Sequence, residues 1–189
     1  MHLHSWLTAP LVALGYVEGG RLISLVAAVG AGICLSLIAR RVAGREAMLL
    51  APALLWVQPM FIRHSWVYQP DTLSIALTTA AVLTGLLFIE SNDDRWYVAA
   101  LVLLVLDITN HMWEAIAALP LVVLFLRDRR WIRAGGVVVL TLVTIPTVIW
   151  LTELQLSGAS TLYTHGTHSV GLGIFLTPGF WLAHLDFHL

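Results

Sequence analysis

Long apolar stretches separated by short polar turns make up most of this chain. A helix that crosses a bilayer needs roughly 20 apolar residues, so stretches near or above that length predict membrane spans. The expected spans lie in Leu22–Ala39, Ala47–Ile62, Thr72–Ile89, Trp96–Leu126 and Ala134–Leu154. Trp6–Val17 is shorter, and we expect it to enter the membrane as a re-entrant or interfacial helix.

Trp96–Leu126 is too long for one span and carries the polar sequence Asp107–His111 near its middle. Arginines follow this stretch, as they follow Leu22–Ala39. Cytoplasmic loops carry an excess of Lys and Arg, so both groups belong on one side of the membrane. Only two crossings within Trp96–Leu126 achieve this. The sequence therefore predicts two short helices that meet at Asn110–His111 on the outer side.

Composition supports a membrane location for the whole chain. Of 189 residues 59% are hydrophobic and 11% are charged, with a mean hydropathy of +0.86. Soluble domains carry about 25% charged residues. All ten basic residues are arginine, and this topology puts eight inside and two, Arg21 and Arg63, outside. Net charge is −1, the arginines form no stripe, and we expect no nucleic-acid partner.

The expected fold is an all-α, polytopic transmembrane helix bundle with about six spans and a re-entrant helix. Cys34 is the single cysteine, so no internal disulfide can form. We expect residues 1–189 to form a single membrane domain in a multi-pass protein of the plasma membrane. A further apolar run, Leu172–Leu189, begins where the sequence stops.

Polar side chains that are not cytoplasmic anchors gather on the outer side of this topology. Such groups are costly near a bilayer and usually face a cavity or one another. Because several separate turns supply them, the pattern predicts a cleft at one membrane face. The residues are His2, His4, Arg63, His64, Gln69, Asp71, Asn110, His111, Glu114, His165 and His168.

Each of these residues also has a purely structural interpretation. Asp71 follows a proline at a helix start, where a carboxylate caps free N–H groups. Arg63 and His64 could form a simple interfacial turn. His111 and Glu114 are three residues apart and could hydrogen-bond on one helix face. The residues alone leave both interpretations open.

Eight histidines raise the question of a divalent metal. His2 with His4 and His165 with His168 would offer imidazole ligands, and Asp71 or Glu114 an oxygen. Their spacing is not specific for any metal site, so the cofactor stays undetermined.

Four segments follow one another in an informative order. They are His4–Leu14 (HSWLTAPLVAL), Arg40–Leu55 (RRVAGREAMLLAPALL), Trp66–Leu77 (WVYQPDTLSIAL) and Leu106–His111 (LDITNH). In this order the chain resembles the GT-C superfamily of membrane glycosyltransferases. The resemblance is to the branch with the protein O-mannosyltransferases and the aminoarabinose transferase that acts on lipid A.

The resemblance implies transfer of a sugar from a polyprenyl- or dolichyl-phosphate donor to an acceptor at the outer membrane face. It makes Asp71 the candidate catalytic carboxylate, for acceptor positioning or for a metal. His4 and His111 stand where the family often has basic residues, and Arg63 could supply the permanent charge that they lack. His64 and Glu114 complete the candidate substrate-binding set. Membrane lipids are the other expected partner.

Family members begin with another span and a large outer loop that bears the catalytic aspartate. That loop would precede His2, and later helices would follow Leu189, so the resemblance implies a fragment truncated at both ends that lacks activity by itself. Two other interpretations are a non-enzymatic membrane protein, such as a transporter fragment or packing subunit, and an outer-face metal-binding protein.

Overall fold

The computed structural model describes residues 3–16, 18–66, 71–110 and 112–158, and these residues are helical apart from short turns. The chain divides into two compact units, Met1–Val148 and Ile149–Leu189, and the first contains most of the described helices. The helices are α1 (Leu3–Ala13), α2 (Gly19–Ala43), α3 (Ala47–Trp56), α4 (Pro59–Trp66), α5 (Asp71–Ser91), α6 (Asp94–Asn110), the 3₁₀ helix η1 (Met112–Ala117), α7 (Ala118–Arg127) and α8 (Trp131–Gly158), which continues into the second unit.

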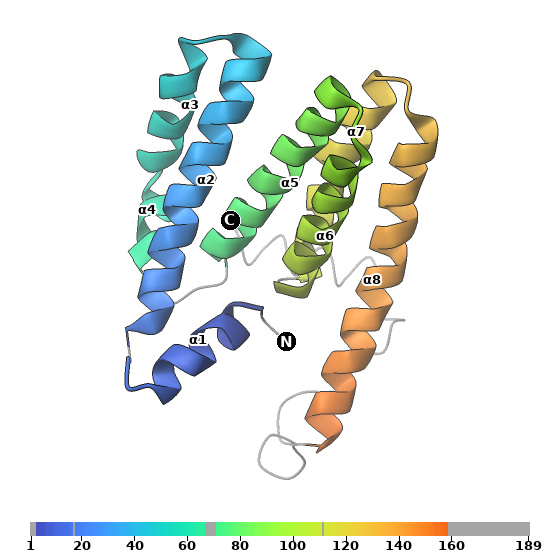
Figure 1. Cartoon of the computed structure of the whole chain (residues 1–189). Helices are drawn as coiled ribbons and strands as arrows, with labels where there is room; N and C mark the ends of the chain where they lie inside the picture. Colours follow the sequence, from blue (N-terminus) through green and yellow to red (C-terminus); the bar gives the residue numbers. More distant parts are fainter. Residues whose placement is uncertain (1–2, 17, 67–70, 111, 159–189) are drawn as a thin grey trace, which may run out of the picture. The chain divides into compact units, whose positions relative to one another are not determined.

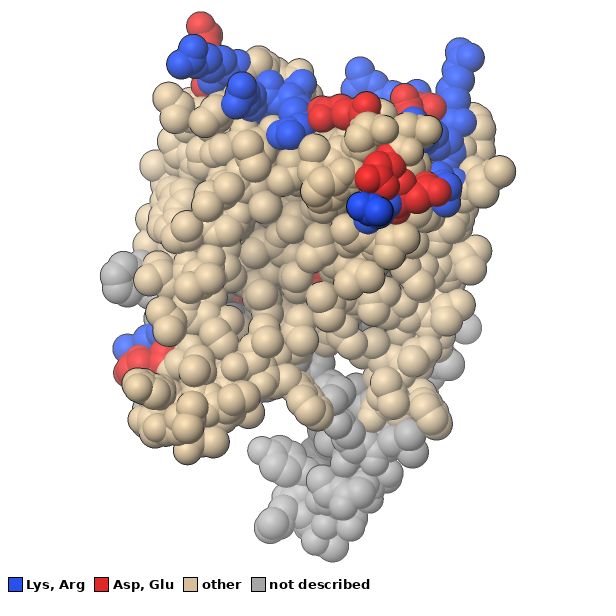
Figure 2. Space-filling view, in the orientation of Figure 1, with Lys and Arg blue, Asp and Glu red and all other residues tan. Residues whose placement is uncertain are grey.

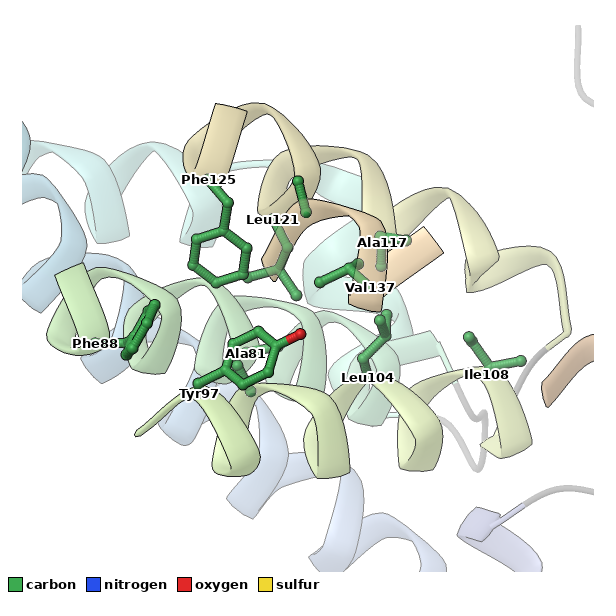
Figure 3. Packing of buried hydrophobic residues seen from close by; sticks show 12 residues of the cluster. Ala81, Phe88, Tyr97, Leu104, Ile108, Ala117, Leu121, Phe125 and Val137 are labelled. Carbon is green, nitrogen blue, oxygen red and sulfur yellow. The ribbon is translucent and has the colours of Figure 1, made fainter. Parts of the chain in front are cut away.

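Helices α5 and α6 pack against each other, with α2 and α7 against α5 (Figure 1). The main core lies between α5, α6, α7 and the first turns of α8 (Figure 3). Phe88, Leu104, Leu121 and Phe125 are fully buried there. The rings of Phe88 and Phe125 meet edge to face with their centroids 5.7 Å apart. Such an arrangement suits the aromatic quadrupole and fixes α5 against α7.

Large apolar side chains also point outward along most helices, with Ile132 in α8 89% exposed and Leu49 in α3 73% exposed. A protein in water rarely exposes so much contiguous apolar surface. Three described helices are long and apolar enough to cross a membrane: Gly19–Ala43, Asp71–Ser91 and Trp131–Leu151. These correspond to three of the expected spans and support the predicted membrane helix bundle.

The segment Ala47–Ile62, expected as one span, is not one continuous helix: it forms two helices, α3 and α4, that separate at Val57 and Gln58. Pro59 has no N–H to donate and disfavours helical geometry at the residue before it. It therefore ends one helix and begins the next. The four residues from Arg63 to Trp66, expected in a turn, are helical and belong to α4.

The two-helix prediction for Trp96–Leu126 was confirmed. Helix α6 ends at Asn110, and η1 and α7 return along the bundle from Met112. His111 lies outside the described residues. The short N-terminal helix is present as well, although α1 begins three residues earlier than expected and ends at Ala13.

The arginines expected on one side gather at one end of the first unit (Figure 2). The turns α2–α3, α5–α6 and α7–α8 meet there (Figure 1). Arg41 Nε donates to Glu90 Oε2 at 3.2 Å, which links α2 to α5. Arg133 donates to Asp94 Oδ1 at 2.7 Å, which links α8 to α6. The turns that hold these arginines therefore share one end, and we call it the arginine end.

Candidate functional site

The opposite end of the first unit contains a buried polar network that joins four helices. His4 in α1 is only 1% exposed, and its backbone N–H donates to Asn110 Oδ1 at 2.9 Å. Its ring Nε2 lies 3.2 Å from Ser24 Oγ in α2. Asn110 at the end of α6 donates through Nδ2 to Ser74 Oγ in α5 at 2.9 Å. We call these four residues the α1 clamp.

Side-chain burial makes the α1 clamp energetically important. His4, Ser24, Ser74 and Asn110 are all almost completely shielded from solvent. A buried polar group without a partner costs about 1–3 kcal/mol, so the paired arrangement strongly specifies how the helices meet. Asn110 contacts Ser74 one helical turn from Asp71, so the end of α6 and the start of α5 lie together at this end of the unit.

A second polar pair lies next to the clamp at the start of α5. His64 Nδ1 in α4 is 2.6 Å from Asp71 Oδ2, with the two side chains 20% and 36% exposed. An ionised carboxylate can only accept hydrogen bonds, so Nδ1 carries the proton and the other ring nitrogen, Nε2, is not engaged with Asp71. A carboxylate and an imidazole held together and partly open to solvent can exchange protons with a bound substrate.

Thr72 follows Asp71 and was not singled out by the sequence. Its side chain is completely buried, and among the described residues its hydroxyl has no hydrogen-bond partner. Buried polar atoms in native proteins nearly always have partners, so this hydroxyl, one residue after Asp71, is an exception within the described part of the chain.

The remaining predicted site residues are less closely connected. Arg63 is exposed on α4, next to His64 in sequence. His4 is buried in the clamp, where its ring contacts Ser24. Glu114 lies in η1, but the structure does not describe its side chain, and His111 falls outside the described residues. The structure thus joins His64 with Asp71, and His4 with Asn110.

Serines and threonines within apolar runs are the polar partners that sequence reasoning missed. Ser74 contacts Asn110, and Thr78 donates to Asp107 Oδ2 at 2.5 Å, also between α5 and α6. Ser74 and Thr78 are four residues apart, as are the positions that share one face of a helix. That spacing opposite the polar sequence Asp107–His111 is the signal that could have identified them.

The metal hypothesis gains no support from the described part of the chain. Within residues 3–16, 18–66, 71–110 and 112–158, no group of three or more His, Cys, Asp or Glu side chains is arranged to hold a metal ion. His2, His165 and His168, which the hypothesis requires, lie outside these residues.

The long apolar helices, outward-facing apolar side chains and segregated arginines define a multi-pass membrane protein. Comparison with protein families then specifies which kind. Residues 3–151 match the family described as "Dolichyl-phosphate-mannose-protein mannosyltransferase", and the chain belongs to this family. It is thereby a membrane protein of the GT-C glycosyltransferase type, as the resemblance predicted. Neither the search of curated proteins nor that of solved structures gave a match.

Proposed function

We propose that this protein transfers a sugar from a polyprenyl- or dolichyl-phosphate donor to a hydroxyl acceptor at the outer face of the plasma membrane. The family supports a lipid-linked mannose donor and a polypeptide acceptor. The single observation that carries the proposal is the His64–Asp71 pair, 2.6 Å apart and partly exposed at the end of the bundle away from the arginines. Positive charge marks the cytoplasmic side, so this pair faces outward.

In the proposed reaction, the acceptor oxygen forms a bond to the anomeric carbon of the sugar. The bond between that carbon and the phosphate oxygen breaks, and its electron pair leaves with the lipid phosphate. Asp71 takes the proton of the acceptor hydroxyl on its carboxylate and becomes a neutral carboxylic acid, while it keeps accepting the hydrogen bond from His64 Nδ1–H. Each bond and proton is then accounted for by groups of the donor, the acceptor and this pair.

Charge stabilisation is the second requirement, because the departing lipid phosphate is an anion. Arg63 is a permanent cation on the exposed side of α4, directly before His64. We assign substrate contacts to Arg63, His64, His111 and Glu114, with His4 supporting them from the α1 clamp.

The test of Asp71 joins the first span and outer loop of a family member to the start of the chain and uses this protein in proteoliposomes, with polyprenyl-phosphate-[³H]mannose as donor and a threonine-rich peptide as acceptor. General bases contribute about 10²- to 10⁴-fold to rate, so Asp71→Asn should lower kcat by at least about 100-fold. Asp128→Asn is the matched control, because Asp128 pairs with Arg130 at the arginine end. Unchanged transfer by Asp71→Asn would refute the catalytic assignment.

A binding measurement tests Arg63 without requiring turnover. Charge-assisted hydrogen bonds contribute about 1.5–3 kcal/mol, so Arg63→Gln should weaken binding of polyprenyl phosphate by roughly 10- to 100-fold. Arg95→Gln removes an exposed arginine of the arginine end and should leave the Kd unchanged. Equal affinity of the Arg63 variant and the parent protein would exclude Arg63 from the donor site.

A further inference from the structure

Asn110 makes two contacts that tie the first helix of the chain to the start of α5. It is the last residue of α6 and is completely buried. A backbone N–H can only donate, so the His4 N–H, 2.9 Å away, fixes Oδ1 as the acceptor. Nδ2 must then point to the other neighbour, Ser74 Oγ, also at 2.9 Å. The amide orientation is therefore determined by its partners.

The contact with α1 replaces a missing helix cap. The first four N–H groups of a helix have no partner within that helix. His4 is the second residue of α1, and the side chain of Asn110 satisfies its N–H from a different helix. An 11-residue helix is too short to be stable alone, so such a contact helps to decide where α1 lies.

The contact with α5 acts close to the proposed catalytic pair. Ser74 is three residues after Asp71, so both side chains lie on the same face of the first turn of α5. The Asn110–Ser74 bond holds that turn against α6, while Asp71 reaches across to His64 in α4. Any rotation or shift of the first turn of α5 changes both contacts together.

We infer that Asn110 is a positioning residue, which holds Asp71 in register with His64 by bonding Ser74 while it anchors α1 through His4. This inference rests on the proposed function only for its effect on transfer. Catalytic groups must be held within about 0.5 Å of their productive geometry. A misplacement of about 1 Å can lower the rate by roughly 100-fold.

The test uses Ser74→Ala, Asn110→Leu and the double variant in the full chain, reconstituted in nanodiscs. Ser74→Ala deletes one oxygen atom and leaves the hydrogen bond between the His4 N–H and Asn110 in place. Thr109→Val is the matched control, because the Thr109 hydroxyl donates only to carbonyls of its own helix, those of Val105 and Leu106. It removes a neighbouring hydroxyl without touching the clamp.

The first readout is the proton resonance of the His64 Nδ1–H, assigned by its absence in His64→Gln. Ser74→Ala and Asn110→Leu should each shift or broaden this resonance. The double variant should resemble Asn110→Leu, because the bond between residues 74 and 110 is already absent there. Thr109→Val should leave the resonance in place. An unchanged resonance in Ser74→Ala and Asn110→Leu would overturn the inference, and Ser74→Ala decides alone if Asn110→Leu does not fold.

The second readout separates this inference from the proposed function. If both hold, Ser74→Ala lowers kcat by about 10- to 100-fold while the Kd for polyprenyl phosphate stays within about twofold. If Asp71→Asn is inactive but Ser74→Ala turns over normally, the positioning inference fails and the proposed function stands. If Asp71→Asn stays active while the resonance shifts in Ser74→Ala, the proposed function fails and the positioning of the pair is supported.

Discussion

The bond between Thr78 and Asp107 offers a sharp test of what holds α5 against α6. Thr78 Oγ1 donates to Asp107 Oδ2 at 2.5 Å, and Asp107 is completely buried. Thr78→Val keeps the shape and branching of the side chain and removes only the hydroxyl. The variant therefore leaves a buried carboxyl oxygen without its donor from α5.

Two general ranges bound the loss of stability expected for Thr78→Val. Loss of one partner of a buried polar group costs about 1–3 kcal/mol in proteins. Hydrogen bonds between membrane helices average about 0.6 kcal/mol and reach about 1.7 kcal/mol, because the unfolded chain also finds partners in the bilayer. The bond is short, which favours the upper part of the range for membrane helices, and Asp107 has another interaction besides this bond. We expect about 1–2 kcal/mol, or roughly a 5- to 30-fold change in the unfolding equilibrium.

The measurement is the free energy of unfolding in mixed detergent micelles, followed by the loss of helicity. Thr84→Val is the control, because Thr84 lies in the same helix and donates only to the carbonyls of Ala80 and Ala81. Its loss should change stability by less than about 0.5 kcal/mol, since no other helix is involved. Equal effects of Thr78→Val and Thr84→Val would refute the reasoning that the bond between helices carries the stability.

Two more predictions concern packing and topology. A Cβ on Gly85 would lie 2.8 Å from Leu121 Cδ2, so Gly85→Ala should lower the free energy of unfolding by about 1–3 kcal/mol. Gly30→Ala is the control, because nothing lies within 4 Å of a Cβ there, and it should not destabilise the protein. Equal unfolding free energies of the two variants would contradict the close approach of α5 and α7. In a Cys34→Ser background, a cysteine at Arg63 should react with a membrane-impermeant maleimide added outside, and one at Arg129 should react only after permeabilisation. The reverse pattern would place the His64–Asp71 pair in the cytoplasm.

Hydropathy and charge predicted the general fold well. The α6–α7 reversal at Asn110 followed from the length of Trp96–Leu126 and the arginines after it, and the structure confirmed it. The separation of α3 and α4 did not follow, although Pro59 was visible in the sequence. Membrane helices tolerate proline where neighbours satisfy the freed groups, so an apolar run that contains proline predicts neither a kink nor a break.

The candidate site could be predicted only in part. His64 and Asp71 are close in the sequence, so both could be assigned to one outer segment. The sequence cannot decide whether Asp71 contacts His64, as the structure shows, or caps its own helix. Thr78 and Thr84 are the same residue type in the same apolar helix, and only one of them bonds across to α6. Which one does so depends on the rotation of α5 about its axis, and this rotation is set by packing.

The two ends of the first unit use polar groups in different ways. At the arginine end, at least one side chain in each of the ion pairs Arg41–Glu90 and Arg133–Asp94 is more than a third exposed. Such exposed pairs contribute about 0–1 kcal/mol to the stability of a protein. At the other end, the bonds of Asn110 and Asp107 are buried, where no water can replace a lost partner. The arginines can therefore set the orientation of the protein in the membrane without determining how its helices pack. A few hydroxyl and amide groups add buried bonds between α5 and α6 to the apolar packing of the core, at the same end as the pair proposed to act on the sugar donor.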